Sequence, residues 1–244
     1  MNNQFEYDYY KKIINVLIKN KYRFSSYLDA DDNKKNVILR HDVDLSLDHA
    51  LLFAELEHEL GVSSTYFILL TSDFYNPMSK INREIIKKII DYGHKVYLHF
   101  DTQIYNYDST EELTKLVNKE IKALSEITGD RNKIVSFHRP IKELFNLGLE
   151  DGIISAYDKR FFSDFNYISD SRMCWKKDPI KEINCCDGNI QLLTHPFWYR
   201  EKELNKSKLI NELIKQNENV IVNSLNNNIS NFNGFFTEEK NNEK

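Results

Sequence analysis

Short apolar segments that alternate with helical patterns constrain the fold of this chain more than any other feature. The segment SSTYFILL at 63–70 ends in a continuous apolar run, as strands covered on both faces do. The stretch after it places Ile85, Ile86, Ile89 and Ile90 at helical spacing. Strands and helices that alternate in this way build βαβ units. We therefore predict an α/β fold whose sheet is mostly parallel.

Histidines and acidic residues gather where the apolar segments end. Parallel strands all end on one side of their sheet, and α/β proteins build their active sites on that side, so we expect these residues to meet. The strand ends read HDVD (41–44), LHFD (98–101), FHRP (137–140), SD (169–170) and THP (194–196).

Asp42 and Asp44 lie two residues apart at the end of the apolar segment that begins at Val37. In an extended chain their carboxylates point the same way, so they repel each other. Such a pair is usually tolerated where a cation or a shared catalytic proton neutralises it. The alternative is a solvated strand end, or an aspartate that caps the next helix.

His99 and Asp101 repeat this spacing at the end of another predicted strand. Imidazoles and carboxylates that converge from different strands suit Zn²⁺, and they also accept Mn²⁺, Co²⁺ or Fe²⁺. With the aspartate pair alongside, we predict that His99 ligates a metal. By contrast, His94 at the start of its strand is predicted to be structural. His49 and His58 are predicted to lie on the surface of a helix.

The 244 residues fit one large domain, and a single α/β barrel is within this size. The patterns predict a core at about 37–222, preceded by a helix at 5–24. An Asn-rich tail at about 232–244 is expected to be disordered. Neither an internal repeat nor a Pro- or Gly-rich linker divides the sequence. We therefore predict a single domain over residues 1–244.

Composition argues against several classes of protein. The net charge of −4, with mixed signs, offers no basic surface for nucleic acid. No apolar run approaches the roughly 20 residues of a membrane span, and the N-terminus does not read as a signal sequence. Cys174, Cys185 and Cys186 are odd in number and form no C-x-x-C motif, so we expect free thiols. These features predict a cytoplasmic protein without a membrane span.

Five segments extend over about 37–198 in the order HDVD, GHKVYLHFD, SFHRP, YISDSRMCW and LLTHP. They resemble the signature motifs of the polysaccharide deacetylase superfamily (NodB-homology, carbohydrate esterase family 4-like). They look most like the branch associated with surface polysaccharide biosynthesis. The first and last segments are fairly specific, whereas the middle ones are loose. The resemblance implies a distorted, TIM-like (β/α) barrel of six to eight mostly parallel strands and a metal-dependent hydrolase of N-acyl sugars.

Carried over position by position, the resemblance implies a catalytic role for four residues. Asp42 would be the general base, and His195 would be the general acid. Arg139 would orient the base, and Asp170 would hold Arg139 in turn.

The metal site implied by the resemblance departs from the superfamily at one position. Asp44 and His99 match metal ligands, but a second histidine usually follows the first after four residues, and Gln103 stands there in this chain. His138 and Asp101 are the candidates for the third ligand. We favour His138 because its strand should neighbour that of His99. If neither serves, the metal site is weakened or lost.

The resemblance also implies a sugar site and a reaction. Trp175 and Trp198 would wall that site, with Asp101 as a further substrate-binding residue; either tryptophan could instead belong to the core. The expected reaction is removal of an acetyl or formyl group from a small N-acyl sugar, free or linked to a nucleotide or lipid, with Zn²⁺ as the expected metal. The alternatives are another amide or cyclic-amide hydrolase, or a non-catalytic sugar-binding protein.

Overall fold

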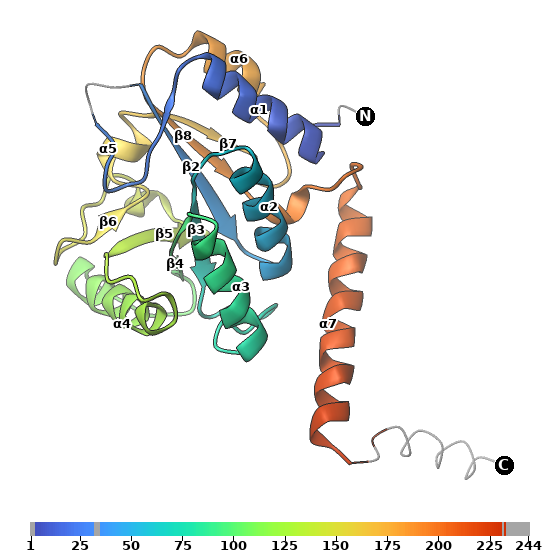
Figure 1. Ribbon diagram of the computed structural model, residues 1–244. Helices are drawn as coiled ribbons and strands as arrows, with labels where there is room; N and C mark the ends of the chain where they lie inside the picture. The colour runs from blue at the N-terminus through green and yellow to red at the C-terminus, as the bar shows by residue number, and fades with distance from the viewer. Residues whose placement is uncertain (1–2, 32–34, 231, 233–244) are drawn as a thin grey trace. The chain divides into compact units, whose positions relative to one another are not determined.

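The computed structural model describes residues 3–31, 35–230 and 232 (Figure 1). The chain divides into two compact units, Met1–Glu203 and Leu204–Lys244. The first unit contains the whole sheet, and the second contains helix α7 (Lys206–Asn228). The tail expected at 232–244 lies outside the described residues, except for Phe232.

Eight strands form one sheet, and every pairing between them is parallel. Their order is β6-β5-β4-β3-β2-β8-β7, and β1 also pairs with β2. The sheet curls into a half-barrel with helices along its outside, which confirms the predicted distorted (β/α) barrel (Figure 1). The strands are β1 (Arg23–Phe24), β2 (Asn36–Val43), β3 (Thr65–Leu69), β4 (Lys95–Asp101), β5 (Ile134–His138), β6 (Ile154–Ser155), β7 (Asn166–Ser169) and β8 (Ile190–Thr194).

The helices of the first unit follow the strands, and polar caps begin several of them. They are α1 (Tyr7–Lys19), α2 (Leu47–Glu59), α3 (Lys80–Asp91), α4 (Thr110–Thr128), α5 (Lys159–Phe162) and α6 (Pro179–Cys185), with short 3₁₀ turns η1 (Lys142–Leu144) and η2 (Pro196–Trp198). Ser46, Ser79 and Ser109 each accept a hydrogen bond from the first turn of α2, α3 and α4. Gly129, at φ 72°, ends α4 in the left-handed conformation that favours glycine.

The first helix is shorter than the predicted range of 5–24. It ends at Lys19, because Lys21 adopts a left-handed conformation with φ 59°. Arg23 and Phe24 then pair with β2 as strand β1. The helical pattern of the sequence therefore describes α1 correctly, but it extends into residues that belong to the sheet.

Strand β2 separates two environments, because alternate side chains of a strand point to opposite faces. Its eight residues are all buried. Arg40 and Asp42 lie inside the curved sheet, where Arg40 reaches Ser136 of β5. His41 lies on the outer face and contacts Glu57 of α2. One strand thus supplies both the active-site side and the helix-packing side of the sheet.

A network around Glu57 fills the outer face of β2. The Glu57 carboxylate accepts hydrogen bonds from the hydroxyl groups of Tyr10 at 2.5 Å, Ser64 at 2.6 Å and Tyr66 at 2.7 Å. His41 Nε2 lies 2.8 Å from the same carboxylate. Both carboxylate oxygens are therefore paired, as a fully buried charge requires. The network joins α1, α2, β2 and β3.

The three histidines that the sequence assigns to structural or helix-surface positions, His49, His58 and His94, have such surroundings except for one. His94 is structural as predicted, with Nε2 2.9 Å from the carbonyl oxygen of Ala54. His58 is exposed and stacks on Tyr92, as expected for a helix surface. His49 is buried rather than exposed, because Phe197 of η2 packs against its ring at a centroid distance of 5.2 Å.

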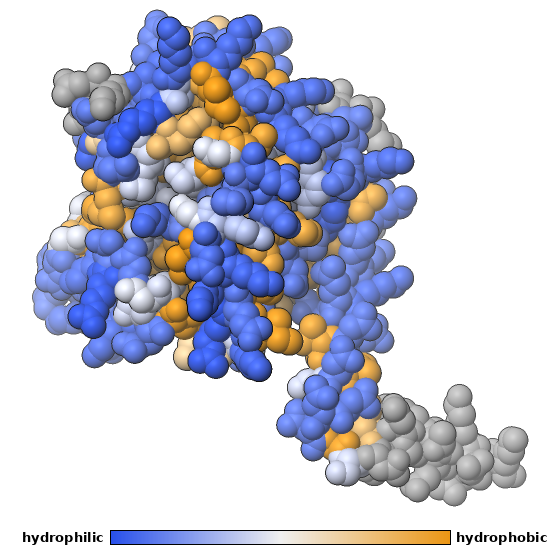
Figure 2. Space-filling view, viewed as in Figure 1, coloured by the Kyte–Doolittle hydropathy of each residue, from blue (hydrophilic) through white to orange (hydrophobic). Residues whose placement is uncertain are grey.

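Hydrophilic side chains cover most of the face shown in Figure 2, with hydrophobic ones in smaller patches among them. Helix α7 carries exposed apolar side chains of its own, including Ile214, Val220 and Ile221. Across the described ranges, each helix is too short or too polar to cross a membrane.

Candidate active site

A cleft with a volume of about 740 Å³ lies at the carboxyl ends of the strands. It is the place where the sequence predicts that histidines and acidic residues meet. Side chains from β2, β4, β5 and β8 and from the residues that follow β2, β4, β5, β6, β7 and β8 line it. They are Asp42, Asp44, His99, Gln103, Phe137, His138, Arg139, Pro140, Tyr157, Ser171, Arg172, Lys176, Leu193, His195 and Trp198.

Asp44, His99 and His138 come together in this cleft. Asp44 Oδ1 lies 3.2 Å from His99 Nε2 and 3.3 Å from His138 Nδ1. The three donor atoms lie within 4.8 Å of one another. The sheet explains this meeting, because β4 pairs with β5 and sets Asp101 opposite His138. The structure therefore groups the three residues that the sequence assigns to the metal.

The chemistry of these three residues fits a divalent metal ion. Asp44 Oδ1 is buried and accepts no well-formed hydrogen bond from a described residue, although two imidazole nitrogens are close to it. Burial acts to raise the pKa of Asp44, but His138, His99 and the charge of His195 outweigh it. The pKa of Asp44 therefore lies below its ordinary value. A carboxylate oxygen and two imidazole nitrogens that face one point are ligands that Zn²⁺ and similar ions accept.

Asp42 is held by Arg40 in a two-point ion pair. Arg40 Nε lies 2.9 Å from Oδ1, and Arg40 Nη2 lies 2.8 Å from Oδ2. Ser136 and Tyr157 fix the guanidinium from the other side, at 2.5 and 2.9 Å. Burial raises the pKa of Asp42, but Arg40 and His99 lower it to below its ordinary value. Asp42 is therefore an ionised carboxylate, 3.6 Å from His99 Nε2.

Arg40 takes the position that the resemblance implies for Arg139, and this corrects the prediction. Arg139 instead pairs with Asp101, and its side chain is 49% exposed. Its backbone has φ 51°, which turns the chain after β5 away from the direction of the strand. A signal for Arg40 was present, since an arginine directly before HDVD lies inside a segment that reads as a buried strand. A buried arginine needs an acidic partner, and Asp42 is two residues away.

His195 is held by Asp170, which was predicted to hold Arg139 instead. Asp170 Oδ1 accepts a hydrogen bond from His195 Nδ1 at 2.6 Å, and Oδ2 accepts one from the His195 backbone N–H at 3.0 Å. Tyr199 also donates to Oδ2, at 3.1 Å. The bond at Nδ1 leaves Nε2 directed at Asp44, 3.8 Å away. Burial lowers the pKa of His195, but the charge of Asp170 raises it to about 9.

The two tryptophans predicted to wall the sugar site have different surroundings. Trp198 lines the cleft, with its ring centroid 6.5 Å from that of His195. Trp175 is buried in the core cluster that includes Ile168 and Ile183, and it does not line the cleft. The core alternative therefore describes Trp175, while Trp198 offers an apolar ring to a bound sugar. Asp101 is the third residue predicted to contact the sugar. It forms an ion pair with Arg139 and accepts a hydrogen bond from the Gln103 backbone N–H at 3.0 Å.

Comparisons with known proteins give matches at the level of structure alone. The chain matches no protein-family model, and no curated protein matches it. A carbohydrate esterase family 4 pseudoenzyme from Bacillus anthracis is 15% identical with a TM-score of 0.45; the match covers 78% of this chain and 62% of that one. The peptidoglycan deacetylase PdaC from Bacillus subtilis is 17% identical with a TM-score of 0.43, over 79% of this chain and 98% of that one.

A family 4 acetyl xylan esterase from Clostridium thermocellum, solved with a cobalt ion, is 14% identical with a TM-score of 0.38; the match covers 75% of this chain and 83% of that one. At such identities and TM-scores, the activities and residue roles of those proteins do not transfer to this chain. The resemblance of this chain to the polysaccharide deacetylase superfamily therefore rests on its five sequence motifs.

Proposed function

We propose that this protein is a metal-dependent hydrolase that removes an acetyl or formyl group from an amino sugar during the synthesis of a surface polysaccharide. The observation that carries the proposal is that one cleft contains an ionised carboxylate and a protonated imidazole. Arg40 keeps Asp42 ionised, and Asp170 keeps His195 protonated. A carboxylate base and an imidazolium acid beside three metal-ligand side chains are what hydrolysis of an amide needs.

Asp44, His99 and His138 would hold the metal, for which Zn²⁺ is our proposal, with Co²⁺, Mn²⁺ or Fe²⁺ as substitutes. When bound there, such an ion polarises an acyl carbonyl group and lowers the pKa of a water molecule. Gln103 lines the same cleft but is not needed as a ligand, because His138 supplies the second imidazole.

We assign the two proton transfers to Asp42 and His195. Asp42 accepts a proton from water as the water oxygen bonds to the acyl carbon. His195 donates its Nε2 proton to the sugar nitrogen as the carbon–nitrogen bond breaks, which yields a carboxylic acid and a free amine. Arg40 holds the Asp42 carboxylate in its ionised form and in a fixed orientation. Asp170 accepts a hydrogen bond from the Nδ1 proton of His195, so that Nε2 is the nitrogen that gives up its proton.

The same proposal places Trp198 against a face of the sugar and the enzyme in the cytoplasm. Its three cysteines are free thiols, which is the usual state in a reducing compartment. A cytoplasmic enzyme would meet small N-acyl sugars, free or linked to a nucleotide or lipid, rather than assembled polymer.

Release of acetate or formate from N-acetyl and N-formyl amino sugars tests the proposal. We expect the full chain, supplied with Zn²⁺, Co²⁺ or Mn²⁺, to release one of these acids. Asp42→Asn should lose turnover because it keeps the shape of the side chain but not its basicity. If no acid is released with any of the three metals, the assignment as an amino-sugar deacylase is wrong.

A further inference from the structure

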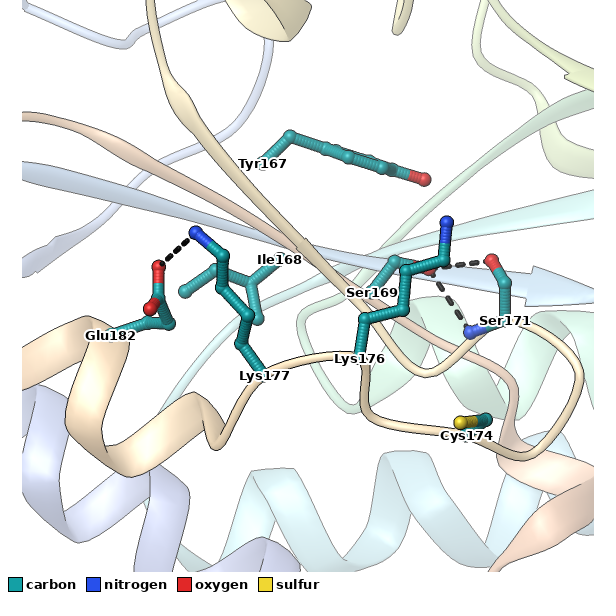
Figure 3. A pocket seen from close by; sticks show the side chains of 8 residues that line it. All are labelled: Tyr167, Ile168, Ser169, Ser171, Cys174, Lys176, Lys177 and Glu182. Atoms are coloured by element: carbon teal, nitrogen blue, oxygen red, sulfur yellow. Dashed lines mark hydrogen bonds and ion pairs between the residues drawn. The ribbon is translucent and has the colours of Figure 1, made fainter.

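A second cavity lies beside the cleft, and nothing in the reaction above uses it. Its volume is about 300 Å³, and it lies between strand β7 at the edge of the sheet and the segment that leads into α6. Tyr167, Ile168 and Ser169 supply one wall. Figure 3 shows the residues of this side cavity.

The side cavity and the cleft share two lining residues, Ser171 and Lys176. The two spaces therefore adjoin at these side chains. A ligand whose reacting group lies near His195 could extend past Ser171 into the side cavity. The segment that divides them is shaped by two consecutive residues in left-handed conformation, Arg172 at φ 63° and Met173 at φ 53°. Such backbone is costly for residues other than glycine, and it is found preferentially at functional sites.

The charge at the junction is positive and unpaired. The side cavity contains two lysines and one acidic residue, but Lys177 Nζ binds Glu182 Oε2 at 3.2 Å. Lys176 makes no ion pair with any residue in the described part of the chain. In Figure 3, Lys177 reaches back to Glu182, whereas Lys176 extends towards the side chains of Ser169 and Ser171. An ammonium group beside hydroxyl groups is a suitable set of donors for an anionic oxygen.

We propose that Lys176 marks an anion subsite, which binds a phosphate or carboxylate carried by the same sugar whose N-acyl group lies in the cleft. This rests on the proposed function and narrows its substrate to acidic N-acyl sugars. The hydroxyl groups of Ser169 and Ser171 are hydrogen-bonded to each other at 2.6 Å, so the one that accepts in this pair would donate its own proton to the anion. Arg172, which lines the cleft beside Ser171, adds positive charge at the entrance.

The test compares a neutral substrate with two acidic ones: N-acetylglucosamine, its 1-phosphate and N-acetylmuramic acid, or the N-formyl analogues if formyl is the group removed. A charge-assisted hydrogen bond predicts a kcat/KM at least about tenfold higher for one acidic sugar than for the neutral sugar. The phosphate and carboxylate substrates show which anion the subsite prefers. Lys176→Ala should remove most of this preference, and Lys176→Glu should reverse it.

Lys181→Ala is the matched control, because Lys181 is an exposed lysine on α6 that lines neither cavity. It should keep the preference for the acidic sugar. The inference is overturned if the wild-type protein uses all three sugars with kcat/KM values within about twofold. It is also overturned if Lys176→Ala lowers kcat/KM equally for neutral and acidic sugars, or if Lys181→Ala acts like Lys176→Ala.

Calorimetric titration separates a failure of this inference from a failure of the proposed function. If no sugar is hydrolysed but the 1-phosphate binds more tightly than N-acetylglucosamine, and Lys176→Ala removes the difference, the anion subsite stands and the deacylase assignment fails. If neither the binding of the 1-phosphate nor that of N-acetylmuramic acid depends on Lys176, the subsite is refuted whether or not the sugars are hydrolysed.

Discussion

Two carboxylates in this protein, the buried Glu57 and the half-buried Asp44, each lie beside two imidazoles, yet their surroundings differ. Glu57 has His41 at 2.8 Å and His94 at 3.8 Å, and three hydroxyl groups complete its hydrogen bonds. Asp44 has His99 and His138 at similar distances, but its buried Oδ1 lacks a well-formed hydrogen bond from any residue the structure describes.

This difference distinguishes a structural cluster, around Glu57, from a candidate metal site, around Asp44. A carboxylate whose oxygens are all paired within the protein has no capacity left for a ligand, and its purpose is to join helices to the sheet. An ionised carboxylate with a buried oxygen that lies near two imidazoles but accepts no well-formed hydrogen bond from a described residue has a place for a cation. Residue types alone do not make this distinction, because both clusters contain one acid and two histidines.

The largest expected effect is on turnover, on the cleft side of the comparison. His195→Ala removes the proton donor and should lower kcat by about 10²–10⁴-fold. The bound metal should remain, because His195 is not one of the three ligands. His58→Ala, at an exposed helix position, is the control and should change little. Full activity in His195→Ala would remove this residue from the mechanism.

The next effect is on stability, on the Glu57 side. Glu57→Ala leaves three hydroxyl groups and two imidazoles without their shared acceptor, and loss of one member of a buried ion pair typically costs about 3–5 kcal/mol. Urea unfolding should therefore show a much lower free energy of unfolding for Glu57→Ala than for Asp44→Ala. An equal loss in the two variants would mean that Asp44 is as structural as Glu57.

The stability contributed by Glu57 should also depend on pH. Burial acts to raise the pKa of Glu57, but the charges of His41 and His94 and the hydrogen bonds of His41 and Ser64 outweigh it. Together they lower the pKa from 4.5 to about 2. Since the folded pKa is the lower one, the stabilisation is complete above about pH 4.5 and is lost as the pH falls towards about 2.

Unfolding measured from pH 6 down to about pH 2 tests this dependence. Wild-type protein should lose stability over the acidic part of the range, and Glu57→Gln should show a shallower loss. A Glu57→Gln curve parallel to that of the wild type would show that other carboxylates cause the loss.

The smallest effect is expected at Arg139. Its pair with Asp101 is half exposed, so Arg139→Ala should change the free energy of unfolding by about 0–1 kcal/mol. Arg40→Lys keeps the charge but cannot form the two-point contact with Asp42, so it should lower kcat more than Arg139→Ala does. A larger loss of kcat in Arg139→Ala would restore Arg139 as the residue that orients the base.

The sequence predicts the parts of this architecture that depend on local pattern. Alternating strands and helices give the parallel sheet, and the polar strand ends give the cleft. His138 meets His99 because neighbouring parallel strands bring equivalent strand ends together. Order and spacing thus bring the strand ends together, whereas the choice of Asp44 as a ligand came from the family resemblance, and His138 was favoured over Asp101 because its strand should neighbour that of His99.

The contacts that the sequence did not predict depend on side-chain direction. Both Arg40 and Arg139 lie at or next to the end of a predicted strand. Only the alternation along β2 shows that Arg40 points to the same face as Asp42, two residues away. Arg139 is turned aside by its left-handed backbone. Trp175 is buried by the packing of α6, which lies in a long segment of weak pattern. The helix end near residue 20 was set by one backbone angle, which apolar spacing does not reveal.

Elemental metal analysis tests the central claim most directly. The full chain, purified without a metal-affinity tag and reconstituted with Zn²⁺, should contain about one equivalent of metal. Asp44→Ala and His138→Ala should each lose it, while Glu57→Gln, which changes the other acid–histidine cluster, should retain it. Absence of metal from the reconstituted wild-type protein, or equal metal content in all four proteins, would contradict the assignment of Asp44, His99 and His138 as the metal site.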